Sequence, residues 1–425
     1  MRHTLGELPE SLDETYERIL KEIKKPNKRL AQRVLQCLVV AIRPLRVAEL
    51  AEVLAVDFED AEGIPRLKPD WLWDDEEEAL LSACSSLIAI VEAGDVVSSD
   101  GNSVAESDDG NSHVKAGDSR IVQFSHFSVK EFLTSSRLIT ASREVSDHHI
   151  DLERAHTILG QACLGVLLQI QYDVEGHTPK DHPLVRYAAK HWTNHAQFGE
   201  VLSSIQEGVE YLFDPDKPHF SVWLTLYDID TYPDYDSPLF FFAPYNKSTA
   251  TPLYYAALCG FHDLVQHLIT KHPQDVNADG GYYMRPILAA LAGEHFTIAD
   301  LLRHNGSDPH VRGFDEHTPL HSAVNRFFNC GHIKVVQKLI EYGADIDAKT
   351  IYGSTPLHWA SEGLHFTDGS IVRLLLEHGS DVNARDEEGL TPFIRKRTKN
   401  FLALVQACTS LYQLVQVTKA QKGKS

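Results

Sequence analysis

Apolar residues recur at helical spacing over most of the chain, and this pattern predicts a mainly α-helical protein. In the C-terminal part, apolar pairs repeat four positions apart on successive short segments, which gives each predicted helix one apolar face. A segment this short cannot bury its apolar face alone, so neighbouring segments must stack. The pairs are Leu264/Val265 with Leu268/Ile269, Val335/Val336 with Leu339/Ile340, and Ile371/Val372 with Leu375/Leu376.

The N-terminal third combines predicted helices with two extended segments. Residues 98–119 are rich in Ser, Asp, Gly and Asn and repeat D-G-N-S, so we expect a low-complexity, disordered stretch there. Helices followed by a two-stranded hairpin predict a winged helix, with 98–119 as its extended wing. The helices are predicted over 8–24, 28–43, 47–56, 76–87 and 128–133, and the extended segments over 88–92 and 120–124.

A proline motif recurs with a regular period in the C-terminal part. The prolines at 252, 286, 319, 356 and 392 are 34, 33, 37 and 36 residues apart, in stretches similar to T-P-L-H-x-A. This period and signature resemble the ankyrin-repeat family over about 160 residues. The resemblance implies a solenoid of four repeats followed by a terminal cap.

The repeat boundaries carry residues suited to helix ends. Threonine precedes proline as an N-cap, and proline then occupies the first helical position, where its missing N–H costs nothing. Arg285 replaces the threonine in the second repeat, so we expect its first helix to be the weakest. Short insertions are expected at 325–331 and 363–369. The threonines are Thr251, Thr318, Thr355 and Thr391, and the helix-ending glycines are Gly306, Gly343 and Gly379.

Aromatic residues in the predicted inter-repeat turns indicate a protein-binding surface. Tyr282, Tyr283, Phe314 and Tyr352 lie where folding alone favours polar residues, and aromatic anchors are enriched in binding hot spots. We expect these four residues to contact a protein partner, with a purely structural spacer role as the alternative. Trp359 is expected to pack within the stack.

Four separated motifs resemble the region that follows the nucleotide-binding core in fungal NACHT–ankyrin proteins. These proteins belong to the STAND group of signal-transducing ATPases, which includes the NOD-like receptors. The resemblance implies a role in signalling or self/non-self recognition, with self-association through assembly of the family's type. The motifs are L-P-E-S-L-D-E-T-Y-E-R-I-L at 8–20, I-R-P-L-R-V-A-E-L at 42–50, F-S-H-F-S-V-K-E-F-L at 124–133 and P-L-V-R-Y-A-A-K-H-W at 183–192.

One histidine matches a nucleotide-sensing position of that group. A histidine in an H-x-S-x-x-E-[FY] stretch contacts the β-phosphate of ADP there, and His126 matches it in H-F-S-V-K-E-F. The alternative is that His126, Glu131 and Phe132 cap and pack their own helix. The sequence has no G-x-x-x-x-G-K-[ST] loop followed by a helix. Because it begins where the family's ATPase core ends, the alternative function is the regulatory C-terminal part of an ATP-driven switch.

Charge and cysteine content narrow the partners and the compartment. The 425 residues have a formal net charge of −20, and no Lys or Arg occurs from Pro69 to Val114, so neither nucleic acid nor a membrane surface is expected as a partner. Six cysteines without a C-x-x-C pair indicate neither a disulfide framework nor a zinc site. The N-terminus lacks the apolar core of a signal peptide. We expect a cytoplasmic protein.

No motif for catalysis or cofactor binding emerges. His191 and His195 have the spacing of a zinc-binding helix, but Trp192 stands where H-E-x-x-H has its glutamate. The acidic segment 228–236 lacks the glycine and glutamate of a calcium loop, and we interpret it as a solvated connection. We therefore expect no enzymatic activity, no metal and no cofactor.

These patterns together predict the order of domains. They are an N-terminal helix at 1–27, a winged-helix-like domain at 28–146, a helical linker at 147–246, ankyrin repeats at 247–410 and a tail at 411–425.

Overall fold

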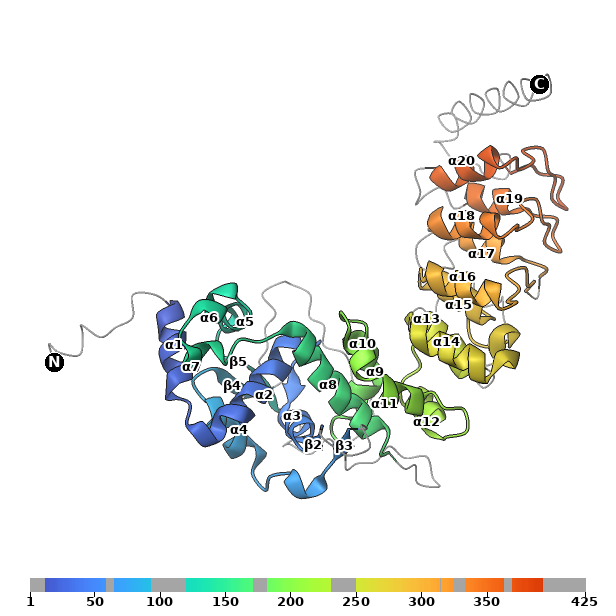
Figure 1. Cartoon of the computed structure of the whole chain (residues 1–425). Coiled ribbons are helices and arrows are strands. Elements are labelled where there is room, and N and C mark those ends of the chain that lie inside the picture. The colour runs from blue at the N-terminus through green and yellow to red at the C-terminus, as the bar shows by residue number, and fades with distance from the viewer. Residues whose placement is uncertain are drawn as a thin grey trace, which may run out of the picture. The chain divides into compact units, whose positions relative to one another are not determined.

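The computed structural model describes residues 12–58, 65–92, 120–170, 182–230, 250–313, 315–324, 333–362 and 369–392. The chain divides into two compact units, Met1–Ile229 and Asp230–Ser425, which are described separately (Figure 1). The expected wing at 98–119, the insertion at 325–331, nearly all of that at 363–369, the terminal cap after Pro392, the tail and Phe314 lie outside the described residues.

The first unit begins with helices packed around a small antiparallel sheet of strand order β1-β5-β4. The predicted extended segments are strands β4 and β5, with Ile90 opposite Val122. The expected two-stranded hairpin was incomplete, because Leu45 and Arg46 form β1 on the other side of β5. A strand of two residues has no periodicity by which a sequence could reveal it. The strands are β1 Leu45–Arg46, β2 Val56–Asp57, β3 Arg66–Leu67, β4 Ile88–Glu92 and β5 Arg120–Phe124, and β2 pairs with β3 in a second sheet.

Helix α4 of this winged-helix part begins directly after a residue whose side chain caps it. The Asp75 carboxylate accepts a hydrogen bond from the Glu78 amide at 2.9 Å, so α4 begins directly after it. Three glutamates in the first turn of α4 favour the positive end of its dipole. The helices are α1 Leu12–Glu22, α2 Lys28–Val40, α3 Val47–Leu54, α4 Glu76–Cys84, α5 Phe127–Leu133, α6 Ser136–Thr140 and α7 Arg143–Ser146.

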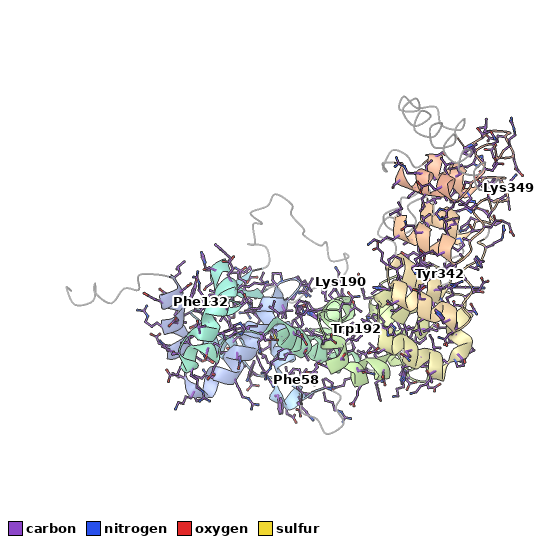
Figure 2. All side chains as sticks on the ribbon, turned by 45° about the horizontal axis from the view of Figure 1, so that its top comes forward. Phe58, Phe132, Lys190, Trp192, Tyr342 and Lys349 are labelled. Atoms are coloured by element: carbon purple, nitrogen blue, oxygen red, sulfur yellow. The ribbon has the colours of Figure 1, made fainter. Side chains whose placement is uncertain are left out.

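A second helical layer completes the first unit around an aromatic core. Trp192 meets Trp223 edge to face with ring centres 5.3 Å apart, and the Trp223 indole N–H donates to the carbonyl of Ala189 at 2.9 Å. Figure 2 shows Trp192 among these helices. Neither indole has exposed surface, so the aromatic cluster anchors the layer. The helices are α8 Leu152–Leu167, α9 Val185–Ala196, α10 Val201–Ser204, α11 Gln206–Leu212 and α12 His219–Leu226.

The second unit is a stack of helix pairs, as the apolar pattern predicts. The pairs follow one another in sequence order along the stack (Figure 1), and their apolar faces are buried between neighbours, as for Val265, Leu302, Val336 and Leu375. Stacking therefore buries apolar surface that a single helix pair would leave exposed. The pairs are α13 Pro252–Cys259 with α14 His262–Lys271, α15 Pro286–Ala292 with α16 Phe296–His304, α17 Pro319–Val324 with α18 Ile333–Glu341, and α19 Pro356–Glu362 with α20 Ser370–Glu377.

Candidate functional site

Buried histidines join the third and fourth repeats to the turns that follow them. The Thr318 amide donates to Nδ1 of His321 at 3.1 Å, so this nitrogen carries no proton. The Nε2–H of His321 therefore donates to the carbonyl of Ser354 at 3.1 Å, at the entrance to the next repeat. Burial lowers the pKa of His321 to about 4, so the ring stays neutral near pH 7.

The same arrangement recurs one repeat later. His358 accepts from the Thr355 amide at 3.1 Å and reaches the carbonyl of Leu390 at 3.2 Å. The hydroxyls of both threonines bond to these histidine rings. Thr251 makes no side-chain cap bond. The expected capping role is therefore wrong for Thr251, whose repeat has Tyr254 where the third and fourth repeats have His321 and His358.

The three helix-ending glycines and Arg285, which replaces a capping threonine, lie at the ends of repeat helices. Gly306, Gly343 and Gly379 have φ of +89°, +90° and +95°, which confirms the left-handed helix ends. Arg285 makes no cap but bridges two turns: its Nε donates to Asp279 at 3.0 Å and its Nη1 lies 3.5 Å from an Asp308 carboxylate oxygen. The missing side-chain cap agrees with the sequence, and the expectation that this first helix is the weakest stays a prediction.

Residues 350–354 form a turn whose backbone is held from both sides. The Ile351 amide donates to the Asp315 carbonyl at 3.0 Å, and the Tyr352 carbonyl accepts from the Glu387 amide at 3.0 Å. Gly353 has φ of +71°, and a β-carbon there would lie 3.1 Å from the Glu387 nitrogen. Three successive inter-repeat turns are thus linked by backbone hydrogen bonds.

The side chains at the tip of this turn point outward. Ile351 is 47% exposed and Tyr352 is 55% exposed. Glu316 and Glu387 on the adjacent turns are exposed too. Figure 2 shows Lys349 on this loop edge of the stack. A rigid turn that presents two apolar side chains to solvent can bind a partner with little loss of backbone entropy.

Tyr282 and Tyr283 occupy a different environment from Tyr352. Both are half-buried, and their rings meet edge to face with centres 5.0 Å apart. The Tyr282 amide donates to Asp230 at 2.6 Å, and the Tyr283 amide donates to the Tyr254 hydroxyl at 3.1 Å. The four aromatics expected at one binding edge are therefore not equivalent: Tyr352 is exposed, Tyr282 and Tyr283 are tied to the first repeat, and Phe314 is outside the described residues.

Asp230 corrects the interpretation of the acidic segment as a solvated connection. Its side chain is only 5% exposed and accepts from the Tyr254 hydroxyl at 2.8 Å. Burial, and then the Asp230 charge, raise the pKa of Tyr254 well above its usual value, so the phenol remains a donor. Residues 231–236 lie outside the described residues. Sequence reasoning missed Asp230 because only its tertiary partners distinguish it from neighbouring acids.

His126 lies at the start of α5 and makes local contacts. Its Nδ1 accepts from the Ser128 amide at 3.3 Å and lies 2.6 Å from the Ser128 hydroxyl. Phe132 is buried against Tyr16, with ring centres 5.4 Å apart, while Glu131 is exposed. The contacts of His126 and Phe132 are those of the structural alternative for this motif.

Trp359 and His195, two further residues considered from the sequence, have defined contacts in the structure. Trp359 is half-buried, stacked with His317 and edge-on to His321, which confirms that it packs within the stack. His195 is fully buried and bonds to Tyr187 and His156. Within the described ranges, no three His, Cys, Asp or Glu side chains are grouped as a metal site. Nor does any helix in these ranges have the length and apolar character needed to span a membrane.

Comparisons with known families agree with both units. Residues 286–386 match the description "Ankyrin repeats (3 copies)", and residues 249–278 match a single ankyrin repeat. Residues 16–106 match the winged helix domain of GPI inositol-deacylase. The chain is thus mainly α-helical, with a winged helix domain and ankyrin repeats. Ankyrin repeats are non-enzymatic interaction modules.

Curated relatives share parts of the chain. The "Azaphilone pigments biosynthesis cluster protein L" of Monascus ruber is 28% identical over 320 residues, which are 72% of this chain and 61% of that protein. The chain thus spans about three-fifths of that relative's length. An ankyrin repeat protein of Rickettsia felis is 44% identical over 61 residues, 14% of this chain and 27% of its own. A potassium channel of Oryza sativa is 36% identical over 94 residues, 22% of this chain and 12% of its own.

Proposed function

We propose that this chain is a non-enzymatic, cytoplasmic protein-interaction module that binds a protein partner along the inter-repeat turns. The observation that carries the proposal is the turn at 350–354. Hydrogen bonds to both neighbouring turns fix its backbone, yet Ile351 and Tyr352 remain exposed. Folding alone gives no reason for two apolar side chains there, whereas an aromatic anchor at an interface commonly contributes about 2 kcal/mol or more.

Tyr282, Tyr283 and Phe314 belong to the same proposed surface. The rings of Tyr282 and Tyr283 are half-buried, and their exposed part can contact a partner. Phe314 directly precedes Asp315 in the sequence, and the Asp315 carbonyl accepts from the Ile351 amide. The partner is a protein and not a nucleic acid, because Asp74–Glu78 is a run of acids and the chain is strongly negative overall.

The test compares the full chain with Tyr352→Ser and with the double variant Ile351→Ser/Tyr352→Ser. Bait chains are incubated with lysate, and retained proteins are quantified by mass spectrometry. Loss of one anchor worth about 2 kcal/mol should reduce the affinity for a partner that the parent retains by about thirtyfold. Thermal stability should stay unchanged, because both residues are exposed. Leu152→Ser, at another exposed apolar residue, is the matched control. Unchanged retention by the double variant would move the binding surface to another face.

The proposed setting is a signalling or self/non-self recognition system of the NOD-like receptor type, with self-association. The support is the order of motifs at 8–20, 42–50, 124–133 and 183–192 together with the winged helix match. The second candidate function is the regulatory part of an ATP-driven switch of the NACHT type. It is favoured by the match of His126 to H-x-S-x-x-E-[FY], since this residue would sense the β-phosphate of ADP held by a nucleotide-binding core supplied outside residues 1–425.

Nucleotide binding separates the two candidates. A fluorescent ATP analogue titrated into this chain should show no saturable binding, because no Walker A loop is present in the sequence. Tight, magnesium-dependent binding by this chain alone would contradict both candidates, because neither has a nucleotide site within it. The switch is favoured if the ADP affinity of a protein containing both a core and this chain falls on His126→Ala.

A further inference from the structure

A hydrogen-bonded chain of polar groups crosses the interior of the first unit, apart from the proposed binding surface. The Ile42 amide lies 3.2 Å from the Tyr187 hydroxyl, which lies 2.9 Å from Nε2 of His195. Nδ1 of His195 lies 2.9 Å from Nδ1 of His156. Tyr187 and His195, both on α9, have no exposed surface, whereas His156 on α8 is half-buried. The chain therefore connects the segment after α2 to a histidine near the surface.

The Ile42 amide sets the direction of every bond in this chain. A backbone N–H can only donate, so the Tyr187 oxygen accepts from it. The phenol hydrogen then goes to Nε2 of His195, its other polar contact among the described residues. A neutral imidazole that accepts at Nε2 carries its proton on Nδ1. His195 therefore donates to Nδ1 of His156, and His156 keeps its own proton on Nε2.

This arrangement is consistent only with two neutral rings. A single proton fits between the two Nδ1 atoms, so an additional proton on the pair must go to Nε2 of His195. The Tyr187 hydrogen would then face a protonated nitrogen and lose its acceptor. Alternatively, His156 turns away and leaves Nδ1–H of His195 without a partner. Both changes leave a buried polar group unsatisfied, which is unfavourable.

The groups packed against the two imidazoles also oppose a positive charge. Burial, and then Lys130 of α5, lower the pKa of His156. Burial is the largest cause for His195 as well, followed by His156 and His191, and its pKa falls to about 3. His156 also stacks on Phe198, with ring centres 4.1 Å apart, so its ring is held in place while neutral.

The other groups around Tyr187 come from α2, the segment after it, α3 and α8. The Arg43 guanidinium lies 5.1 Å from the centre of the Tyr187 ring and is paired with Glu49 of α3 at 2.6 Å. Cys37 of α2 and Cys163 of α8 are buried, and burial raises the pKa of Cys37 to about 12, so both remain neutral thiols. Apart from His191, whose ring centre lies 4.9 Å from that of Tyr187, the groups here that can take up a proton near neutral pH are thus the two histidines of the chain.

We propose that this chain of hydrogen bonds is a pH-sensitive latch that holds α8, α9 and the segment after α2 together while both histidines are neutral. An unfolded histidine has a pKa of about 6.5. The latch contributes fully above that pH, and its contribution decreases as the pH falls, because the unfolded chain binds protons that the latch excludes. Acidification therefore loosens the contact between these three segments.

The first test is the pH dependence of unfolding of the full chain. Unfolding in urea is followed by tryptophan fluorescence in a Trp359→Phe background, in which every remaining tryptophan lies in the first unit. In His156→Gln, the amide oxygen can still accept from His195 but does not titrate. Between pH 7.5 and 5.0 the folding equilibrium constant of this variant should fall less than that of the parent. The difference is about tenfold for each unit by which the pKa of His156 is lowered, up to about thirtyfold, because pH 5.0 lies about 1.5 units below the unfolded value.

His149→Gln, in the same unit, should keep the parent's pH dependence. An identical pH dependence in His156→Gln and the parent would overturn the latch. A second measurement does not need a stable variant. Long-range ¹H–¹⁵N spectra of histidine-labelled parent protein at pH 7.5 should include a proton on Nδ1 of His195 and on Nε2 of His156. A proton on Nε2 of His195 would mean that His195 donates to Tyr187 and accepts from His156, the reverse of the proposed directions.

Discussion

The Nε2 atom of His321 lies 3.1 Å from the carbonyl oxygen of Ser354, so a side chain of the third repeat holds the backbone that opens the fourth. The other ring nitrogen accepts from the Thr318 amide of its own repeat. One buried imidazole thus satisfies polar groups on both sides of a repeat boundary. This explains why the T-P-L-H stretch combines threonine and histidine three positions apart.

Removing that ring should destabilise the stack. His321→Ala leaves the Thr318 amide and the Ser354 carbonyl without their partner in a buried site, and an unsatisfied buried group costs about 1–3 kcal/mol. We expect the free energy of unfolding of the second unit to fall by about 2–4 kcal/mol once the lost packing is included. Urea unfolding measures it through the Trp359 part of the fluorescence, which is the difference between the chain with Trp359 and the same chain with Trp359→Phe; the Trp359 ring lies edge-on to that of His321. His310→Ala, at an exposed turn position, should change little.

The same histidine predicts a pH dependence. Because burial lowers the pKa of His321 to about 4 and an unfolded histidine titrates near 6.5, the unfolded chain binds more protons between these values. Stability should therefore be complete above about pH 6.5 and decline by up to about 1.4 kcal/mol per pH unit below it. His321→Ala should lose this part of the slope. Equal slopes for parent and variant between pH 6.5 and 4.5 would contradict the assignment.

Repeats could be predicted from the sequence because their signals are local and recur. A proline at the first helical position, a glycine at the helix end and an apolar face each act within one repeat, and the structure has helix pairs where they predict them. The two-residue strand β1 and the buried Asp230 carry no such signal. Their roles depend on partners distant in sequence: Val122 opposite Leu45, and Tyr254 bonded to Asp230.

The binding surface was harder to predict for the same reason. Turn aromatics were identified by position, but exposure depends on what each turn packs against. Tyr282 is held by Asp230 at the start of the stack, while Tyr352 lies between two other turns with its side chain outward. Ile351, next to Tyr352, was overlooked because a β-branched residue in a short turn resembles core sequence. Two adjacent apolar residues before a glycine were the signal that could have revealed it.

Loss of the Asp230 carboxylate should weaken the first repeat. In Asp230→Ala, the Tyr254 hydroxyl loses an acceptor in a buried site and the Tyr282 amide loses one in a partly buried site. We expect a loss of about 2–4 kcal/mol in the free energy of unfolding of the second unit. The exposed Asp263→Ala provides the control. Asp230→Asn should recover part of the loss because its amide oxygen can still accept. A substitution without effect would return this segment to the role of a solvated connection.

The ion pair between Arg43 and the buried Glu49 gives the I-R-P-L-R-V-A-E-L motif its structural role. Glu49 is 1% exposed and accepts from both terminal nitrogens of Arg43, at 2.8 and 2.6 Å, and from the Arg46 amide at 2.8 Å. Glu49→Ala should lower the free energy of unfolding by about 3 kcal/mol, because it leaves the Arg43 charge and the first turn of α3 without their acceptor. Arg43 is 32% exposed, so water replaces part of the lost interaction and keeps the cost at the lower end of the usual range.

An exposed ion pair in the same unit is the matched control for Glu49→Ala. Arg137 and Asp13 lie 3.1 Å apart with side chains 82% and 43% exposed. Asp13→Ala should change the free energy of unfolding by less than about 1 kcal/mol, because solvent screens this pair. Both variants are measured by urea unfolding in the Trp359→Phe background at pH 7.5. Similar losses for the two variants would mean that burial does not distinguish the pairs, and the motif would need another explanation.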